Sequence, residues 1–164
     1  PWLRPEEMAS DTSSSVDVSL HALDWYQAEI GKVDGFLLLQ PTSPFRTQET
    51  IKNSIKLFSK HKMKSVVGFS PVNNHPLWCY KLENGIMKPF IDNNKEHLKS
   101  QDLPPLYITN GSIYLITPDE LRINKSFYKG NIVPYIIDNP RESLDIDTLW
   151  DWEIAELICN KEIE

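Results

Sequence analysis

The stretch Phe36–Arg46, with the sequence FLLLQPTSPFR, decides the fold class of this chain. It opens with four apolar residues in a row, too few for a helix, which predict a strand buried on both faces of a parallel sheet. In open α/β sheets, ligands bind just beyond the carboxyl ends of the strands. The polar remainder of the stretch carries an amide, two hydroxyls and a guanidinium, which suit a polar, anionic ligand. Alternatively, Pro41 and Pro44 only shape a tight turn, and both interpretations stay open at this point.

Helix and strand patterns alternate on both sides of this stretch. Apolar spacing predicts helices at 16–30 and 48–60, the first capped by Ser14 or Ser15, and a strand is expected at 64–70. This order predicts right-handed crossover units in a doubly wound, mostly parallel α/β sheet.

The second half of the chain continues this pattern. Strands are expected at 107–116, where Gly111 indicates a bulge or a close ligand approach, and near 132–137. Thr117 and Pro118 begin a helix, and a last helix runs from 148 to 163 behind a Thr148–Asp151 capping box. The residues of this helix expected to face the core are Trp150, Ile154, Leu157 and Ile158.

A hairpin interrupts the alternating pattern. Two strand-like runs, 78–82 and 86–90, flank the dipeptide Asn84-Gly85, which favours a tight hairpin turn. The segment from about 75 to 105 is therefore interpreted as an inserted arm that serves as a lid or a dimer contact. Within it, residues 92–103 are polar and are expected to form a surface excursion.

Composition limits the possible classes of function. The 164 residues fit a single domain, 1–164, and a net charge of -6 argues against nucleic-acid binding. Because no apolar run approaches the roughly 20 residues that span a bilayer, no membrane partner is expected. Cys79 and Cys159 form no CxxC motif, which predicts free thiols and a cytoplasmic location. There is also no Gly-rich phosphate loop, and the chain opens at Pro1 without a methionine.

Two polar clusters are candidate sites. Ser13, Ser14 and Ser15 lie at a predicted helix N-terminus, where free amides and the helix dipole favour anions, although capping alone needs only one of them. Asp145 and Asp147 lie two apart in an extended segment, so their carboxylates share one face and would repel without a cation. Magnesium suits such a pair; the alternative is a helix cap beside a solvated carboxylate.

Four motifs in order carry a resemblance to a known family. They are RPEEMASDTSSS at 4–15, LQPTSPFR at 39–46, NGSIY at 110–114 and SLDID at 143–147. Together they resemble the acylneuraminate cytidylyltransferases, or CMP-sialic acid synthetases. The resemblance implies a Rossmann-like nucleotidyltransferase fold, usually dimeric through an inserted arm. It also implies that CTP and a nonulosonic acid react, with magnesium, to give the CMP-sugar and pyrophosphate.

The resemblance also implies roles for individual residues. Arg4 and Ser13, Ser14 and Ser15 match positions that hold the nucleotide. Gln40, Asn110 and Tyr114 match the sugar-acid motifs, and Asp145 and Asp147 match the catalytic metal carboxylates. In such an enzyme the anomeric hydroxyl of the sugar attacks the α-phosphorus of CTP, so that catalysis is mostly positioning and electrostatics.

The chain departs from the family pattern in two places. The family's N-terminal strand and basic triphosphate loop would precede Pro1, so this segment alone is expected to be inactive. Leu77-Trp78 and Ser100 stand where many sialic-acid members carry basic residues, which indicates a different nonulosonate, of legionaminic or pseudaminic type. Lys81 or Lys88 are possible substitutes.

Two other functions remain as alternatives. A 3-deoxy-octulosonate cytidylyltransferase would share the fold and the chemistry, but the motifs at 4–15 and 110–114 favour the acylneuraminate branch. A non-catalytic nucleotide-binding or dimerisation module would keep the fold without the triphosphate loop.

Overall fold

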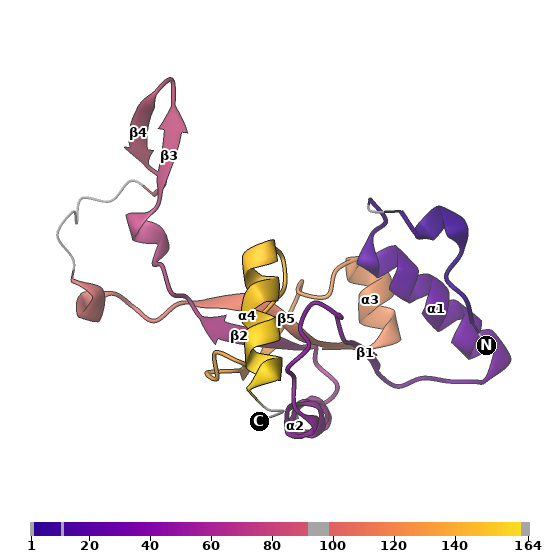
Figure 1. Cartoon of the computed structure of the whole chain (residues 1–164). Helices are drawn as coiled ribbons and strands as arrows, with labels where there is room; N and C mark the ends of the chain where they lie inside the picture. Colours follow the sequence, from indigo (N-terminus) through magenta and orange to yellow (C-terminus); the bar gives the residue numbers. More distant parts are fainter. Residues whose placement is uncertain (1, 11, 92–98, 162–164) are drawn as a thin grey trace.

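The computed structural model describes residues 2–10, 12–91 and 99–161 of the chain. In chain order its elements are η1 (Glu6–Met8), α1 (Ser15–Glu29), β1 (Phe36–Leu38), α2 (Gln48–Lys60), β2 (Val66–Pro71), η2 (Pro76–Trp78), β3 (Tyr80–Glu83), β4 (Ile86–Pro89), η3 (Ser100–Asp102), β5 (Tyr107–Ile116), α3 (Pro118–Asn124), β6 (Val133–Ile136) and α4 (Leu149–Asn160). Figure 1 shows that the hairpin of β3 and β4 stands apart from the larger sheet and its helices.

The larger sheet has four strands in the order β1-β5-β2-β6. The strand β5 lies between β1 and β2 and is antiparallel to both, whereas β2 is parallel to β6. Three of these four strands therefore point in the same direction, with β5 reversed among them. The predicted α/β class with an inserted hairpin is confirmed, and the topology is compatible with a Rossmann-like nucleotidyltransferase fold.

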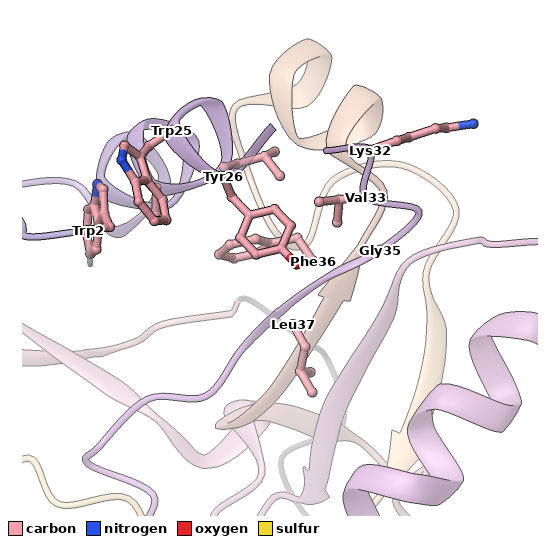
Figure 2. Close-up of a pocket in the computed structure, with 10 residues that line it drawn as sticks. Trp2, Trp25, Tyr26, Lys32, Val33, Gly35, Phe36 and Leu37 are labelled. Atoms are coloured by element: carbon pink, nitrogen blue, oxygen red, sulfur yellow. The ribbon is translucent and has the colours of Figure 1, made fainter. Parts of the chain in front are cut away.

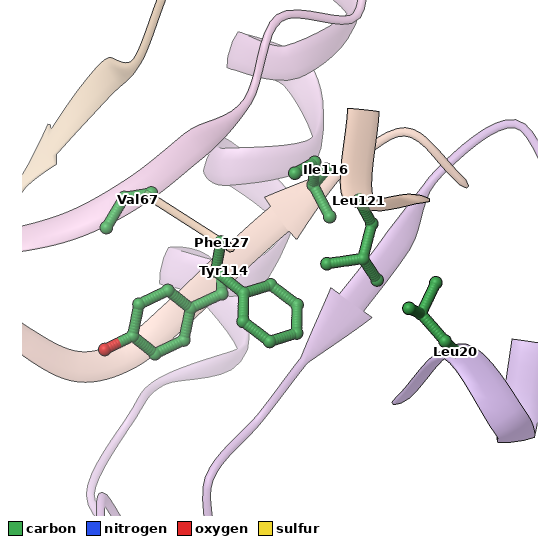
Figure 3. Close-up of a cluster of buried hydrophobic side chains, with 6 residues drawn as sticks. All are labelled: Leu20, Val67, Tyr114, Ile116, Leu121 and Phe127. Carbon is green, nitrogen blue, oxygen red and sulfur yellow. The ribbon is translucent and has the colours of Figure 1, made fainter. Parts of the chain in front are cut away.

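Helices cover both faces of this sheet. On one face α2 contacts β2, β5 and β6, and its Phe58 packs with Val66 and Leu115. On the other face α1 and α3 contact each other and help to form the cluster in Figure 3, which consists of Leu20, Val67, Tyr114, Ile116, Leu121 and Phe127. Adjacent residues of one strand enter opposite clusters because side chains alternate across a sheet.

The prediction for the apolar run at 36–39 is only partly right. Leu37 packs with the α2 cluster and Leu38 with the cluster of Figure 3, so both faces are covered as expected. However, β1 is an edge strand beside an antiparallel neighbour, and Leu39 is already 37% exposed. The strand buried on both faces is β5, whose residues 110–116 are all buried. An apolar run does not reveal the direction of its neighbour, which is why the assignment failed.

Most predicted helix starts and turns are confirmed. The helix α2 has the bounds expected from its apolar spacing, and Ser14 caps α1 by accepting from the Val16 amide. Thr117 caps α3 with Pro118 at its first position, and α4 begins with the Thr148–Asp151 capping box. These starts are predictable because a side-chain oxygen there satisfies an otherwise free amide.

The prediction for the buried face of α4 is wrong. Trp150 is 67% exposed and Leu157 is 62% exposed, while Ile154 and Ile158 are half-buried. The buried residue of this helix is Ala155. The helix ends at Asn160 with Lys161 as its C-cap, and residues 162–163 of the predicted helix lie outside the described residues.

The hairpin of β3 and β4, which we call the arm, has two unlike faces. Asn84 and Gly85 form its turn with φ values of 52° and 81°, as predicted. Leu82 pairs with Met87, and their side chains are 66% and 64% exposed. The alternate residues carry charge, with Glu83 bridging Lys81 at 2.7 Å and Lys88 at 2.8 Å. The residues 92–98 of the predicted surface excursion lie outside the described residues.

Two further sequence expectations can be compared with the structure. Among the described residues, no helix is long and apolar enough to cross a membrane. Cys79 and Cys159 are both free and exposed, as expected from their spacing. The cytoplasmic location that this spacing suggested stays a prediction.

Candidate functional site

Several of the predicted site residues, among them Gln40, Asn110 and Asp145, gather where the sheet strands end. The loop that follows β1 and the segment that follows β6 lie at one edge, together with the first half of the reversed strand β5. Asn110 of β5 donates to Ser70 of β2 at 2.9 Å, and Ser70 donates to the Ile137 carbonyl beyond β6 at 2.9 Å. Neighbouring strands are thereby linked at this edge by buried polar side chains.

Three side chains converge on Gly111. This residue has a φ of +73°, and a Cβ placed on it would lie 2.6 Å from Asp145 Oδ2, 2.9 Å from Ser43 Oγ and 3.0 Å from Gln40 Oε1. The pairing of β2 with β5 also shifts register beside it, between Val67 and Phe69. The predicted bulge is therefore present, and only a residue without a side chain allows Gln40, Ser43 and Asp145 to meet here.

The carboxylate pair lines a cavity of about 720 Å³, which we call the acidic cavity. Asp145 and Asp147 both border it, as do Asp138, Asp151 and the predicted substrate residue Asn110. Ser43 Oγ donates to Asp145 Oδ1 at 3.3 Å, which orients that carboxylate. Asp151 is already engaged as the cap of α4, and the bonds from Thr148 lower its pKa.

The donor set of the acidic cavity fits magnesium. Three of its carboxylates, Asp138, Asp145 and Asp147, stand outside the capping box of α4. Within the described residues, no group of three or more His, Cys, Asp or Glu side chains is arranged to hold a metal. Magnesium commonly needs only one or two protein carboxylates, since water and phosphate oxygens complete its shell.

A second cavity, of about 400 Å³, lies on the other side of Gln40. We call it the aromatic cavity. It brings together four predicted residues, Ser14, Ser15, Gln40 and Tyr114. Burial, chiefly, and the nearby charge of Asp145 raise the pKa of Tyr114, so its phenol stays protonated. The predicted nucleotide and sugar residues thus share a cavity that adjoins the carboxylates through Gln40 and Gly111.

Sequence reasoning missed one wall of the aromatic cavity. That wall consists of Lys125, Ser126, Phe127 and Tyr128, which follow α3. Lys125 has a positive φ of 46° and ends α3, and Phe127 belongs to the core cluster of Figure 3. No spacing or motif marks these residues, because their proximity to Gln40 arises only in the folded chain.

Two predicted nucleotide residues lie elsewhere. Arg4 donates to the Met8 carbonyl, and Ser13 shares a hydrogen bond with Ser10 at 2.8 Å. Neither residue borders the acidic or the aromatic cavity in the described structure. Their assignment to the nucleotide stays a prediction.

Arg46 supports the loop through two backbone carbonyls. Its guanidinium donates to the Ser112 carbonyl at 3.0 Å and to the Gln40 carbonyl. Burial lowers the pKa of Arg46, and the nearby Asp145 carboxylate opposes that effect. Arg46 therefore fixes the backbone that presents Gln40, which favours the structural interpretation for this residue.

A third cavity, of about 500 Å³, lies between α1 and β1 and contains none of the predicted site residues. Figure 2 shows Trp2, Trp25, Tyr26 and Phe36 along its wall. Its lining is mainly apolar and includes Phe36 and Leu37 of β1, the edge strand of the sheet in the described residues.

Comparison with known proteins identifies relatives along nearly the whole chain, although no family profile matches it. A CMP-N,N'-diacetyllegionaminic acid synthase of Legionella pneumophila is 39% identical over 160 residues, which cover 95% of this chain and 67% of that protein. An N-acylneuraminate cytidylyltransferase of Streptococcus agalactiae is 32% identical over 151 residues, covering 92% of this chain and 35% of that protein. An N-acylneuraminate cytidylyltransferase of Escherichia coli is 32% identical over 160 residues, which cover 97% of this chain and 37% of that protein.

The chain therefore spans about two thirds of the Legionella relative and a little over one third of the other two. Alignment over almost every residue of this chain agrees with the four ordered motifs of its sequence. These identities show that the chain belongs to the acylneuraminate cytidylyltransferase family.

Proposed function

We propose that the full-length protein transfers CMP from CTP to a nonulosonic acid and releases pyrophosphate. The observation that carries this proposal is the convergence of Gln40, Ser43 and Asp145 on Gly111, between the aromatic cavity and the acidic cavity. A two-substrate reaction needs adjacent sites for an organic acid and a metal-bound phosphate, and this arrangement supplies both.

The aromatic cavity is proposed to hold the sugar acid. Gln40 and Tyr114 offer an amide and a neutral phenol, and Phe127 offers an apolar surface for acyl and ring carbons. Lys125 is the cation in this lining and suits the substrate carboxylate or a phosphate. The free amides at the start of α1, beside Ser15, add positive potential for an anion.

The acidic cavity is proposed to hold the metal and the triphosphate. Asp145 and Asp147 would bind Mg²⁺, which when present neutralises charge on the phosphates and leaving group. The anomeric oxygen would then form a bond to the α-phosphorus while the bond to pyrophosphate breaks, and the hydroxyl proton would be released to solvent. Because Gln40 and Asp145 approach the same point at Gly111, the hydroxyl and the α-phosphorus would meet there.

A legionaminic-type acid is the proposed sugar. Leu77-Trp78 and Ser100 replace basic residues expected for sialic acid, and the 39% identical relative is named for a diacetyllegionaminic acid. Lys81 and Lys88, the possible substitutes, are both engaged by Glu83 on the arm.

A second copy of this chain is the proposed partner of the arm. An isolated two-stranded hairpin is at best marginally stable in water, yet Leu82 and Met87 are left uncovered. Replacing Leu82 and Met87 together by Glu should shift the protein toward the monomer in light scattering. The matched control is Ile123→Glu on α3, where an 80% exposed residue should leave the mass unchanged. An unchanged mass in the arm variant would contradict this contact.

The activity is tested by incubating the full-length protein with CTP, Mg²⁺ and one of three acids. The acids are N,N'-diacetyllegionaminic acid, N-acetylneuraminic acid and 3-deoxy-octulosonate, and CMP-sugar and pyrophosphate are measured by mass spectrometry and a coupled assay. The fastest turnover is expected with the legionaminic acid. Faster turnover of 3-deoxy-octulosonate would favour the neighbouring activity, and no product with any acid would favour a non-catalytic module.

A further inference from the structure

The loop that carries the carboxylate pair runs beside the loop that carries Gln40. The Ile146 amide donates to the Thr42 carbonyl at 2.8 Å, and Ser43 donates to Asp145 at 3.3 Å. Further along, the guanidinium of Arg141 stacks over the ring of Phe45 at 5.2 Å. The two loops are thus joined at several successive points, with their directions opposed.

Glu142 forms the most connected of these links. Its Oε1 atom accepts hydrogen bonds from the Thr47 amide at 3.0 Å, from the Thr47 hydroxyl at 3.2 Å and from the Thr50 hydroxyl. Thr47 is the N-cap of α2, so this carboxylate lies at the positive end of a 13-residue helix. Hydrogen bonds to an ionised acceptor are about twice as strong as neutral ones.

The helix that follows the carboxylates supports them by a hydrogen bond, since Asp151 of α4 accepts from the Asp147 amide at 3.2 Å, but it adds little packing. Leu149 is 84% exposed and Trp150 is 67% exposed, so the first turn of α4 contributes little packing. In contrast, α2 packs firmly on the sheet, where Thr50 is 3% exposed and Phe58 is 3% exposed. An attachment to α2 can therefore hold the carboxylate loop in place in a way that its attachment to α4 cannot.

We propose that Glu142 is a positioning residue that fixes Asp145 and Asp147 against the Gln40 loop by anchoring them to α2. This role rests on the proposed function, because Glu142 matters only if Asp145 and Asp147 must be held in position to bind the metal. Glu142 touches neither substrate nor metal in this scheme. Groups that orient metal ligands typically change metal affinity or activity 10- to 100-fold when removed.

The test compares four variants of the full-length protein. Glu142→Ala removes the anchor, and Thr50→Val removes one of its donors from the α2 side. Glu142→Gln is the conservative variant, because all three donors bond to one oxygen, which an amide oxygen replaces. Glu153→Ala, an exposed residue of α4, is the matched control.

Three measurements distinguish positioning from simple capping of α2. They are the Mn²⁺ dissociation constant by electron paramagnetic resonance without nucleotide, hydrogen exchange of the Ile146 amide, and the Tm. Glu142→Ala should weaken Mn²⁺ binding about 10- to 100-fold and accelerate Ile146 exchange. Thr50→Val and Glu142→Gln should do so less, because each keeps part of the link, and the control should stay near wild type.

Two outcomes would overturn the proposal. One is a lower Tm for Glu142→Ala with Mn²⁺ binding and Ile146 exchange as in wild type, which would make Glu142 a cap alone. The other, decisive if Glu142→Ala does not fold, is wild-type Mn²⁺ binding and exchange in Thr50→Val. An inactive wild-type protein would instead remove the proposed function, while these binding and exchange measurements would still decide the anchoring.

Discussion

The sheet and the arm are both built from strands, yet they are stabilised in different ways. In the sheet, residues 110–116 of β5 are buried on both faces, and the same strand brings Gly111 beneath the candidate site. In the arm, a tight turn and two ion pairs hold two strands whose apolar residues Leu82 and Met87 remain exposed. The sheet therefore encloses a core, whereas the apolar face of the arm is exposed in the part of the chain that the structure describes.

The largest effect is expected on turnover, at an exposed residue of the candidate site whose side chain contributes little to stability. Asp147→Asn should lower turnover of the full-length protein about 1,000-fold, because it removes a carboxylate proposed to hold the metal. Asp147 is exposed, so circular dichroism and Tm should stay unchanged. Glu156→Gln on α4 is the control, and near-normal activity of Asp147→Asn would remove Asp147 from the metal site.

Truncating one leucine in each region tests where the core lies. Leu121 is fully buried under the sheet, so Leu121→Ala should lower the free energy of unfolding by about 3 kcal/mol. Leu82→Ala in the arm should change it by less than about 0.5 kcal/mol at protein concentrations too low for association. Urea denaturation measures both, and equal losses would mean that the chain itself covers the arm.

Alanine substitutions at two glycines with similar positive φ values distinguish an effect on stability from an effect on activity. Gly111 and Gly85 have φ values of 73° and 81°, so the backbone conformation alone should make an alanine at either position cost about 1 kcal/mol of stability. At Gly85 no atom lies within 4 Å of the added Cβ, whereas at Gly111 it displaces three site residues. Gly111→Ala should therefore also lower kcat/KM about 100-fold. Equal kinetics for the two variants would show that the convergence at Gly111 does not matter.

The smallest effect concerns the charged face of the arm. Hydrogen bonds from Lys81, and then from Lys88, lower the pKa of Glu83 below its ordinary value of 4.5. Because the folded-state pKa is lowered, these bonds stabilise the arm above pH 4.5 and are lost as the pH falls through the folded value. Lys81→Met should raise the Glu83 pKa in an NMR titration, and so should high salt. A pKa that responds to neither would rule out the ion pairs in solution.

The sequence predicts local structure in this protein better than packing. Thr117 and Thr148 begin their helices as expected, and Asn84-Gly85 forms its turn, because each depends on neighbours in the chain. The direction of β5 and the exposure of Trp150 were not predictable, because an apolar pattern does not say what will cover it. The predicted helix α4 did form, but two of the apolar residues expected to face the core, Trp150 and Leu157, are exposed.

The candidate site divides in the same way. Gln40, Asn110, Tyr114 and Asp145 could be selected from motifs, and the structure places them around two adjoining cavities. Lys125 and Glu142 could not be selected, since each matters only through residues distant in the sequence. Arg46 was a reasonable ligand by chemistry alone, but the backbone carbonyls it binds became visible only in the fold.

The position of β5 between β1 and β2 also sets an order of events during synthesis. Phe36 of β1 pairs with Ile116 of β5, and β5 lies between β1 and β2. The strands β1 and β2, which come earlier in the chain, therefore do not pair with each other. Among the strands of the described structure, β1 and β2 gain their shared partner only when β5 has emerged, after the whole arm has been made. Such long-range closure slows folding and leaves apolar strands exposed meanwhile. Shortening the arm should therefore bring β5 to its partners sooner.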